Sequence, residues 1–160
     1  MVHRDLKPDN IQLGDFGEVF ITDWGVAKYM EDPPLELGEA LIVGTAAYMA
    51  PEQAAGLDAE VDERADIYAL GMMLYEALTL SRPYVAENRQ QWLEAAKNVV
   101  PLPPSSVARD REVPPDLDLL TMRMLEKRRE KRPQSMREVW LALDAFEAGD
   151  LERERRTGRA

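Results

Sequence analysis

The 160-residue sequence contains no cysteine and only one histidine, His3. The first absence excludes disulfide bonds, thiolate metal sites and cysteine nucleophiles, and the second argues against a histidine-based zinc site. No stretch approaches about 18 uninterrupted apolar residues, and the N-terminus has no apolar signal core. The sequence therefore predicts no membrane span and no membrane partner, and we expect a cytoplasmic globular protein.

An excess of positive charge is also lacking, because the formal net charge is −10 at pH 7. Phosphate backbones are bound by clustered lysine and arginine, so this charge argues against nucleic acid as the main partner. The basic residues that do occur gather at 123–137 and 153–159, where glutamates separate them. That mixture is typical of a solvated helix face.

The pattern of apolar residues predicts a mainly helical fold with a small β-hairpin at its N-terminal end. Short apolar runs at 11–13 and 18–22 flank a Gly-Asp-Phe-Gly turn signal. Residues 26–50 have no sustained period and predict a long loop, which in a compact domain is usually functional. Helices are predicted at about 64–80 and about 87–100, from Pro115 onward and after Pro133.

The last predicted helix has its own start signal and its own apolar face. Ser135 and Glu138 have the spacing of a capping box. The buried stripe is predicted to contain Met136, Val139, Trp140 and Leu143. From Glu147 onward the residues are almost all charged, so this segment either frays or continues as an exposed helix.

Four motifs follow one another along the chain. They are His3-Arg4-Asp5-Leu6-Lys7-Pro8-Asp9-Asn10, Asp23-Trp24-Gly25, Gly44-Thr45-Ala46-Ala47-Tyr48-Met49-Ala50-Pro51-Glu52 and Asp66-Ile67-Tyr68-Ala69-Leu70-Gly71. The first matches the H-R-D-L-x-x-x-N catalytic loop of protein kinases. With all four in register, the sequence resembles the C-terminal lobe of eukaryotic-type serine/threonine protein kinases of bacteria, an α+β fold. We assign the resemblance to residues 1–147 and leave 148–160 as a charged tail.

The resemblance implies a role for five residues. Asp5 would orient the acceptor hydroxyl and take its proton, and Lys7 would touch the transferred phosphate. Asn10 and Asp23 would bind Mg²⁺, and Thr45 would hydrogen-bond near Asp5 and Lys7. A carboxylate suits this task because phosphoryl transfer requires mainly positioning and electrostatics. Lys7 belongs to the serine/threonine type of catalytic loop, which favours those acceptors over tyrosine.

The sequence offers two candidates for the metal-binding aspartate. Asp15 begins the family's usual Asp-Phe-Gly tripeptide, but it falls on the predicted hairpin turn. Asp23 directly follows the second predicted strand, where the family places the metal ligand, so we assign Mg²⁺ to Asp23. Trp24 then replaces the usual phenylalanine, and its ring is expected to pack against His3.

Further residues are implied to have structural roles. Glu52 would form a buried ion pair with Arg132. Asp66 would accept backbone N–H groups from the catalytic loop around His3 and Arg4, because a buried carboxylate needs partners. The alternative for Asp66 is a solvated carboxylate in the first turn of a helix. The Ala-Pro-Glu sequence that contains Glu52 is also a helix start, and the two interpretations are compatible.

The segment from Val26 to Gly44 contains no serine or threonine, and Tyr29 is its only hydroxyl. In the family, Arg4 would face a phosphorylated residue of this segment. Four acidic residues supply fixed negative charge there instead: Glu31, Asp32, Glu36 and Glu39. We therefore predict that the segment is not switched by Ser/Thr phosphorylation.

Nothing in the 160 residues matches the elements with which such a kinase grips ATP. There is no G-x-G-x-x-G loop, no Val-Ala-Ile-Lys strand and no adenine-binding hinge before the catalytic loop. We expect ATP and Mg²⁺ as cofactors of the complete enzyme, a protein with a Ser or Thr acceptor as substrate, and catalytic silence of the isolated chain. Its main partner would be the missing N-terminal lobe or the full-length protein, and apolar surface would be left exposed.

Met1-Val2 fits the interior of a longer kinase sequence, which favours a truncated gene product, a misplaced start or a fragment. The alternative function is a non-catalytic interaction module that keeps the helical docking surface of a kinase lobe.

Overall fold

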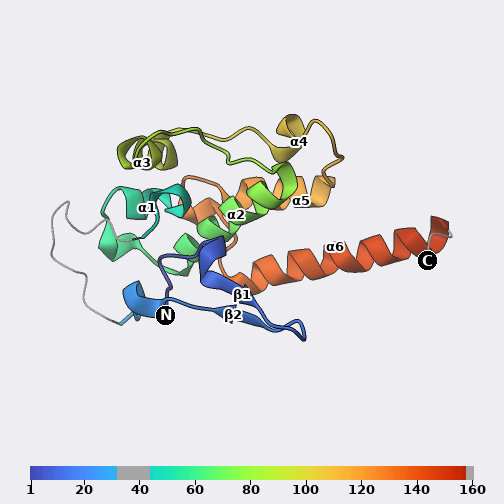
Figure 1. The fold of residues 1–160 in the computed structure, drawn as a ribbon, viewed down its shortest axis with the longest axis horizontal. Coiled ribbons are helices and arrows are strands. Elements are labelled where there is room, and N and C mark those ends of the chain that lie inside the picture. Colours follow the sequence, from blue (N-terminus) through green and yellow to red (C-terminus); the bar gives the residue numbers. More distant parts are fainter. Residues whose placement is uncertain (32–43, 158–160) are drawn as a thin grey trace.

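The computed structural model describes residues 1–31 and 44–157 (Figure 1). These residues form a mainly helical body with one two-stranded antiparallel sheet near the N-terminus. The helices are α1 (Pro51–Ala54), α2 (Glu63–Thr79), α3 (Arg89–Asn98), α4 (Pro104–Val107), α5 (Pro115–Met124) and α6 (Met136–Thr157). The predicted fold class is confirmed, and among the described helices none is both long and apolar enough to cross a bilayer.

The hairpin consists of β1 (Ile11–Leu13) and β2 (Val19–Ile21), paired in the register Ile11↔Ile21 and Leu13↔Val19. Asp15 lies in the turn that joins the strands, as predicted. The hairpin exposes several apolar side chains, and that of Phe16 is 94% exposed. An apolar ribbon of this kind is typical of a surface that another segment covers.

Helix α2 is the central element, and its side chains contribute to two of the buried clusters. The Asp62 side chain caps its N-terminus by accepting the N–H of Arg64. Gly71 allows α5 to approach closely, because a Cβ at this position would lie 2.7 Å from the Cβ of Met124. Tyr68 and Met72 are buried on the same helix. α2 is therefore the scaffold on which the other elements are placed.

Helices α1 and α3 form a second layer against the short 3₁₀ helix η4 (Ala46–Tyr48). The Asn88 side chain caps α3 by accepting the N–H of Gln91. Leu93 and Ala96 of α3 pack against Met49, so this layer holds the segment that follows Gly44. Figure 1 shows α3 and α1 stacked on the same side of α2.

Helix α6 departs from the body as a long rod (Figure 1). One of the two bonds of the predicted capping box is present, because Ser135 Oγ accepts the N–H of Glu138 at 3.2 Å. The second is not formed, since the Glu138 carboxylate accepts the N–H of Gln134 and not that of Ser135. Val139 is buried as predicted, but Trp140 is 59% exposed, so its place in the buried stripe was wrong. One residue turns a helix by about 100°, which directs Trp140 away from the face that Val139 buries.

The charged tail was predicted to begin at residue 148, and α6 continues through this position without a break. The chain continues as helix through residue 157, and residues 158–160 lie outside the described part. The domain boundary at 147 stays a prediction.

Candidate active site

The loop that precedes the hairpin is fastened to the first turn of α2. The backbone N–H groups of His3 and Arg4 donate to the two oxygens of Asp66 at 2.8 and 2.9 Å. Asp66 is buried, so the alternative of a solvated carboxylate is wrong. Burial raises the pKa of the Asp66 carboxyl, and the two N–H bonds offset only part of that effect. These bonds stabilise the left-handed backbone of Arg4, whose φ is 69°.

Asp5, Lys7 and Thr45 meet in one cluster of hydrogen bonds. The Asp5 carboxylate accepts Lys7 Nζ at 2.9 Å and the Thr45 N–H at 2.5 Å, on different oxygens. Lys7 Nζ also donates to Thr45 Oγ1 at 2.9 Å. Burial alone would raise the pKa of Asp5, but the bonds from Lys7 and Thr45 outweigh it and hold this pKa below its usual value. Asp5 is therefore ionised at neutral pH.

Gly44 allows Thr45 to reach Asp5. Gly44 has φ +109°, a conformation that side chains disfavour, and a Cβ there would lie 2.8 Å from the carbonyl oxygen of Arg4. On the next element, the Gln53 side chain donates to the same carbonyl at 2.8 Å. The segment after Gly44 thus packs directly on the backbone of the loop that contains Asp5, which brings Thr45 to Asp5.

Asn10 and Asp23 lie at the open end of the hairpin. The Asn10 amide nitrogen donates to the carbonyl of Asp5 at 2.9 Å, which leaves the amide oxygen for another ligand. Thr22 donates its N–H to the carbonyl of Asn10 at 2.9 Å, so the next residue, Asp23, is a close neighbour of Asn10. Asp15 lies at the opposite end of the hairpin.

The two side chains at the open end have the chemistry of a Mg²⁺ site. Asp23 is exposed and has a left-handed backbone with φ 63°, and its side chain forms no hydrogen bond or ion pair with the described residues. Carboxylate and amide oxygens are hard donors, and Mg²⁺ usually keeps several waters or phosphate oxygens beside one or two protein ligands. The described residues contain no group of three or more acidic or histidine ligands, so this pair would depend on such additional oxygens.

His3 connects the loop that contains Asp5 to the end of β2. Its Nδ1 accepts the N–H of Asp5 at 3.3 Å, and its Nε2 lies 3.0 Å from the carbonyl oxygen of Thr22. A carbonyl oxygen only accepts, so Nε2 carries the proton. The Trp24 ring stands edge-on to the imidazole, with centroids 4.7 Å apart, which is the packing expected from the sequence.

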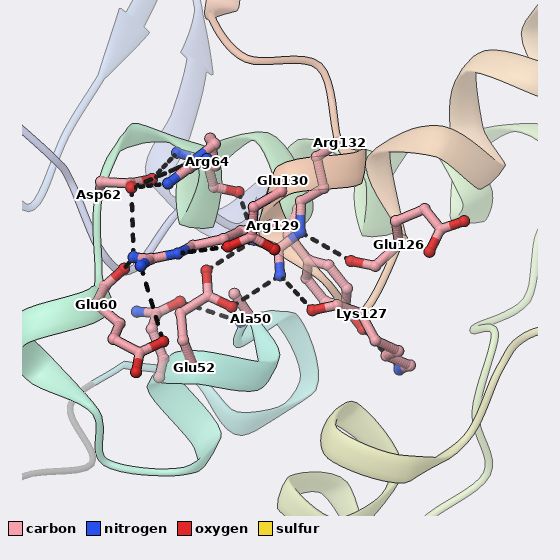
Figure 2. A network of polar contacts seen from close by, with 12 residues as sticks. Ala50, Glu52, Glu60, Asp62, Arg64, Glu126, Lys127, Arg129, Glu130 and Arg132 are labelled. Atoms are coloured by element: carbon pink, nitrogen blue, oxygen red, sulfur yellow. Dashed lines mark hydrogen bonds and ion pairs between the residues drawn. The ribbon is translucent and has the colours of Figure 1, made fainter.

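The expected ion pair between Glu52 and Arg132 is present (Figure 2). Two guanidinium nitrogens of Arg132 donate to separate oxygens of Glu52, each at 2.7 Å. Arg132 is 1% exposed and also donates to the carbonyl oxygens of Arg64, Glu126 and Lys127. The pair therefore fixes α1 to the segment between α5 and α6.

Lys28 and Asp58 also belong to the site, although neither residue is part of a sequence motif. Arg4 Nη1 donates to Asp58 Oδ1 at 2.8 Å, and Lys28 Nζ donates to Asp58 Oδ2 at 2.6 Å. No sequence pattern connects these positions, because the contacting residues are far apart along the chain and lie outside the regular helices and strands. Of the acidic residues expected to supply negative charge, Glu31 is exposed. The other three, Asp32, Glu36 and Glu39, lie outside the described residues.

Comparison with known proteins explains why these side chains occur together. The family model described as "Protein kinase domain" matches residues 1–141. The chain belongs to the protein kinase family. This protein kinase chain is 38% identical over 173 aligned positions to the serine/threonine-protein kinase PknD of Chlamydia trachomatis, covering 95% of the chain and 18% of the relative. It is 36% identical to a probable serine/threonine-protein kinase of Streptomyces coelicolor, covering 91% of the chain and 21% of the relative.

A third relative, the PknD of Protochlamydia amoebophila, is 36% identical, with 95% of this kinase chain and 17% of the relative covered. The kinase chain thus spans about a fifth of the length of these relatives. Their names identify them as serine/threonine kinases, which agrees with the interpretation of Lys7 made from the sequence. The recognition of the family from its motifs is confirmed.

Proposed function

We propose that these residues form the substrate- and metal-binding part of a protein kinase that transfers the γ-phosphate of ATP to Ser or Thr hydroxyls of a protein. The observation that carries the proposal is the Asp5 carboxylate, which accepts hydrogen bonds from Lys7 and Thr45, while the Asn10 side chain donates to the backbone carbonyl of Asp5. Asp23 adds a metal-binding carboxylate beside Asn10. Phosphoryl transfer requires this combination of positioned base, cation and metal ligands.

Each residue would have a distinct task. Asp5 would accept a hydrogen bond from the acceptor hydroxyl and orient its oxygen toward the phosphorus. Because the pKa of Asp5 is lowered, it is a weak base, and proton transfer would come late, when the hydroxyl is already bonding to phosphorus. The Lys7 ammonium would neutralise charge on the transferred group.

Asn10 and Asp23 are the residues that would hold Mg²⁺, and both present oxygen atoms of the kind this ion prefers. When bound, Mg²⁺ would supply charge neutralisation at the phosphates. The residues that enclose ATP would come from outside these 160 residues and would pack on the exposed apolar side of the hairpin. Since ATP is a cytoplasmic cosubstrate, we propose a cytoplasmic location for the lobe.

The test uses the full-length gene product with Mg²⁺-ATP and a protein or peptide acceptor. Asp5→Asn should lower kcat by roughly 10²- to 10⁴-fold, the usual contribution of a positioned acid or base. Asp9→Asn is the matched control, because Asp9 carries the same charge in the same loop but is exposed. Equal activity of the two variants would contradict the role of Asp5. Phosphate should appear on serine or threonine, identified by mass spectrometry.

A second pair of variants tests the metal site. Asp23→Asn should raise the Mg²⁺ concentration needed for half-maximal activity by at least about tenfold, as the loss of a ligand contact usually does. Asp15→Asn removes the same group from the Asp-Phe-Gly turn and should leave that concentration unchanged. The reverse result would exchange the roles of the two aspartates. If the full-length protein transfers no phosphate at all, the alternative of a non-catalytic interaction module holds.

A further inference from the structure

A third cluster of charges lies behind the loop that carries Asp5. Arg4, Lys28 and Asp58 form it, with ion pairs of 2.8 Å to Arg4 and 2.6 Å to Lys28. The three side chains are 10%, 10% and 13% exposed. Lys28 Nζ also donates to the backbone carbonyl of Asp58 at 3.2 Å. Asp58 thus offers both carboxylate oxygens and its carbonyl to two cations.

Each cation belongs to a segment that carries a residue of the proposed site. Arg4 immediately precedes Asp5, and its Nε donates to the carbonyl of Val26 at 2.6 Å. Lys28 is on the segment that follows Asp23, and it pairs with Val2 through two backbone hydrogen bonds of 2.8 and 2.9 Å. The Asp58 carboxylate therefore connects the segment that follows α1 to both segments that carry the catalytic and metal-binding carboxylates.

The charge balance explains why this carboxylate matters. Within the described residues, neither Arg4 nor Lys28 forms an ion pair with any acidic residue except Asp58. Among the described residues, loss of the Asp58 charge would leave two mostly buried cations facing each other, and repulsion and loss of solvation would drive the two segments apart. The helical core does not depend on these contacts, because Asp58 lies in the short 3₁₀ helix η5 (Asp58–Glu60) and both cations lie in non-helical segments. The displacement would therefore fall on the site and not on the core.

We propose that Asp58 is a positioning residue for phosphoryl transfer, which holds Arg4 and Lys28 so that Asp5 and Asp23 keep their relative placement without a phosphorylated residue at this cluster. This inference rests on the proposed kinase function. On this proposal, the partner of Arg4 is a permanently charged carboxylate that lies outside the segment 26–44. The carboxylate is part of the folded chain, so its effect does not depend on a modifying enzyme.

The decisive variant is Asp58→Asn, which keeps the shape of the side chain and removes its charge. In the full-length protein, we expect kcat to fall by about 10- to 100-fold, the range for residues that orient catalytic groups, while the KM for the acceptor changes little. Asp58→Glu restores the charge and should recover part of kcat. Glu60→Gln is the matched control, because Glu60 is on the same η5 helix and its side chain is 51% exposed.

A readout that is independent of activity separates this inference from the proposed function. The amide hydrogens of His3, Arg4 and Lys28 are bonded to Asp66 and Val2, so loosening of the two segments should speed their exchange with solvent by about tenfold in Asp58→Asn and not in Glu60→Gln. If the wild-type protein transfers no phosphate but amide exchange in Asp58→Asn is faster as expected, the proposed kinase function fails, while the role of Asp58 in holding the two segments is supported. If the wild type is active and Asp58→Asn keeps its kcat, the inference is overturned.

Lys28→Met covers the case in which Asp58→Asn does not fold. This variant leaves one cation facing one carboxylate, so the cluster changes from one excess positive charge to neutral. It cuts the tie to the segment that carries Asp23, and several-fold more Mg²⁺ should then be needed for half-maximal activity. An unchanged Mg²⁺ requirement in an active Lys28→Met enzyme would contradict the proposal.

Discussion

The guanidinium group of Arg132 grips the carboxylate of Glu52 with two parallel hydrogen bonds of 2.7 Å, although 80 positions separate the residues along the chain. Geometry of this kind is characteristic of the strongest ion pairs. Both side chains are buried, so neither charge can return to water when its partner is removed. Removal of either partner alone would therefore leave a buried charge without its counter-ion.

Glu52→Gln should lower the free energy of unfolding of the 160-residue chain by about 3–5 kcal/mol, because it leaves the buried Arg132 charge without its counter-ion. Urea unfolding followed by circular dichroism measures the change. Arg123→Ala is the control, since the Arg123–Glu138 pair has the same 2.7 Å distance but side chains that are 47% and 41% exposed. It should cost less than about 1 kcal/mol. Equal costs would show that burial does not decide the strength of these pairs.

Gly71→Ala should destabilise the chain, although alanine normally strengthens a helix. A Cβ at Gly71 would lie 2.7 Å from the Cβ of Met124 and 3.3 Å from Leu125, both on the tightly packed α5 side. Overpacking of this kind typically costs about 1–3 kcal/mol, which exceeds the gain of roughly 1 kcal/mol from helix propensity. Thermal unfolding checks the sign. A higher melting temperature in Gly71→Ala would mean that α5 moves away without cost.

The stability of the chain should depend on pH through Lys127. Its ammonium donates to the hydroxyl of Tyr84 at 2.8 Å and to the carbonyl of Ala96 at 2.7 Å, and burial lowers its pKa from 10.5 to about 8, with the charge of Arg132 acting in the same direction. Between these two pH values the unfolded chain binds more protons at Lys127 than the folded chain does. Its contribution to stability therefore grows as pH rises from 8 toward 10.5 and is lost as pH falls through 8.

Urea titrations of the wild type and Lys127→Met between pH 7 and about pH 9.5 measure this effect. The wild type should gain stability relative to the variant across the upper part of the range. Tyr68 has a pKa raised mainly by burial and contributes in the opposite sense only above pH 10, so the comparison stops below that value. A constant difference between the two proteins would show that Lys127 keeps its ordinary pKa.

Thr45 should act through its hydroxyl and not as a phosphorylation site. Thr45→Val removes the bond to Lys7 but keeps the N–H bond to Asp5, and a lost bond to a charged group should lower kcat of the full-length kinase by about 10-fold or more. Thr45→Ser should keep most activity. Mass spectrometry of the active protein should find no stoichiometric phosphate at Thr45, and an activating phosphate there would contradict the prediction that this segment is not switched.

The sequence predicted the elements and the contacts that local patterns encode. The hairpin followed from two short apolar runs around a glycine turn, and the order of strand, turn and strand placed Asp15 in the turn and Asp23 after the second strand. The start of α5 followed from Pro115, because proline is tolerated in the first turn. The bonds from Asp66 to the catalytic loop and the pair between Glu52 and Arg132 were expected through resemblance to the family, which carries information about distant contacts that spacing alone lacks.

Other features could not be predicted because they depend on where distant loops and helices finally pack. Trp140 is 59% exposed while its neighbour Val139 is buried, because α6 turns only one face toward α2 and α5, and the apolar pattern alone does not show where that face ends. The convergence of Arg4 and Lys28 on Asp58 has no periodic signal, since all three lie outside the α-helices and strands. A charged residue in a loop is most often solvated, and only the folded chain reveals the exception.

The attachment of His3 and Arg4 to Asp66 also sets an order of events during translation. The acceptor lies 63 positions downstream of His3. At synthesis rates of about 5–20 residues per second, it is made several seconds after the loop that it must hold. Contacts that distant in sequence form late in folding. In a newly made chain, the loop that contains Asp5 therefore remains without its attachment until α2 has been synthesised and has folded.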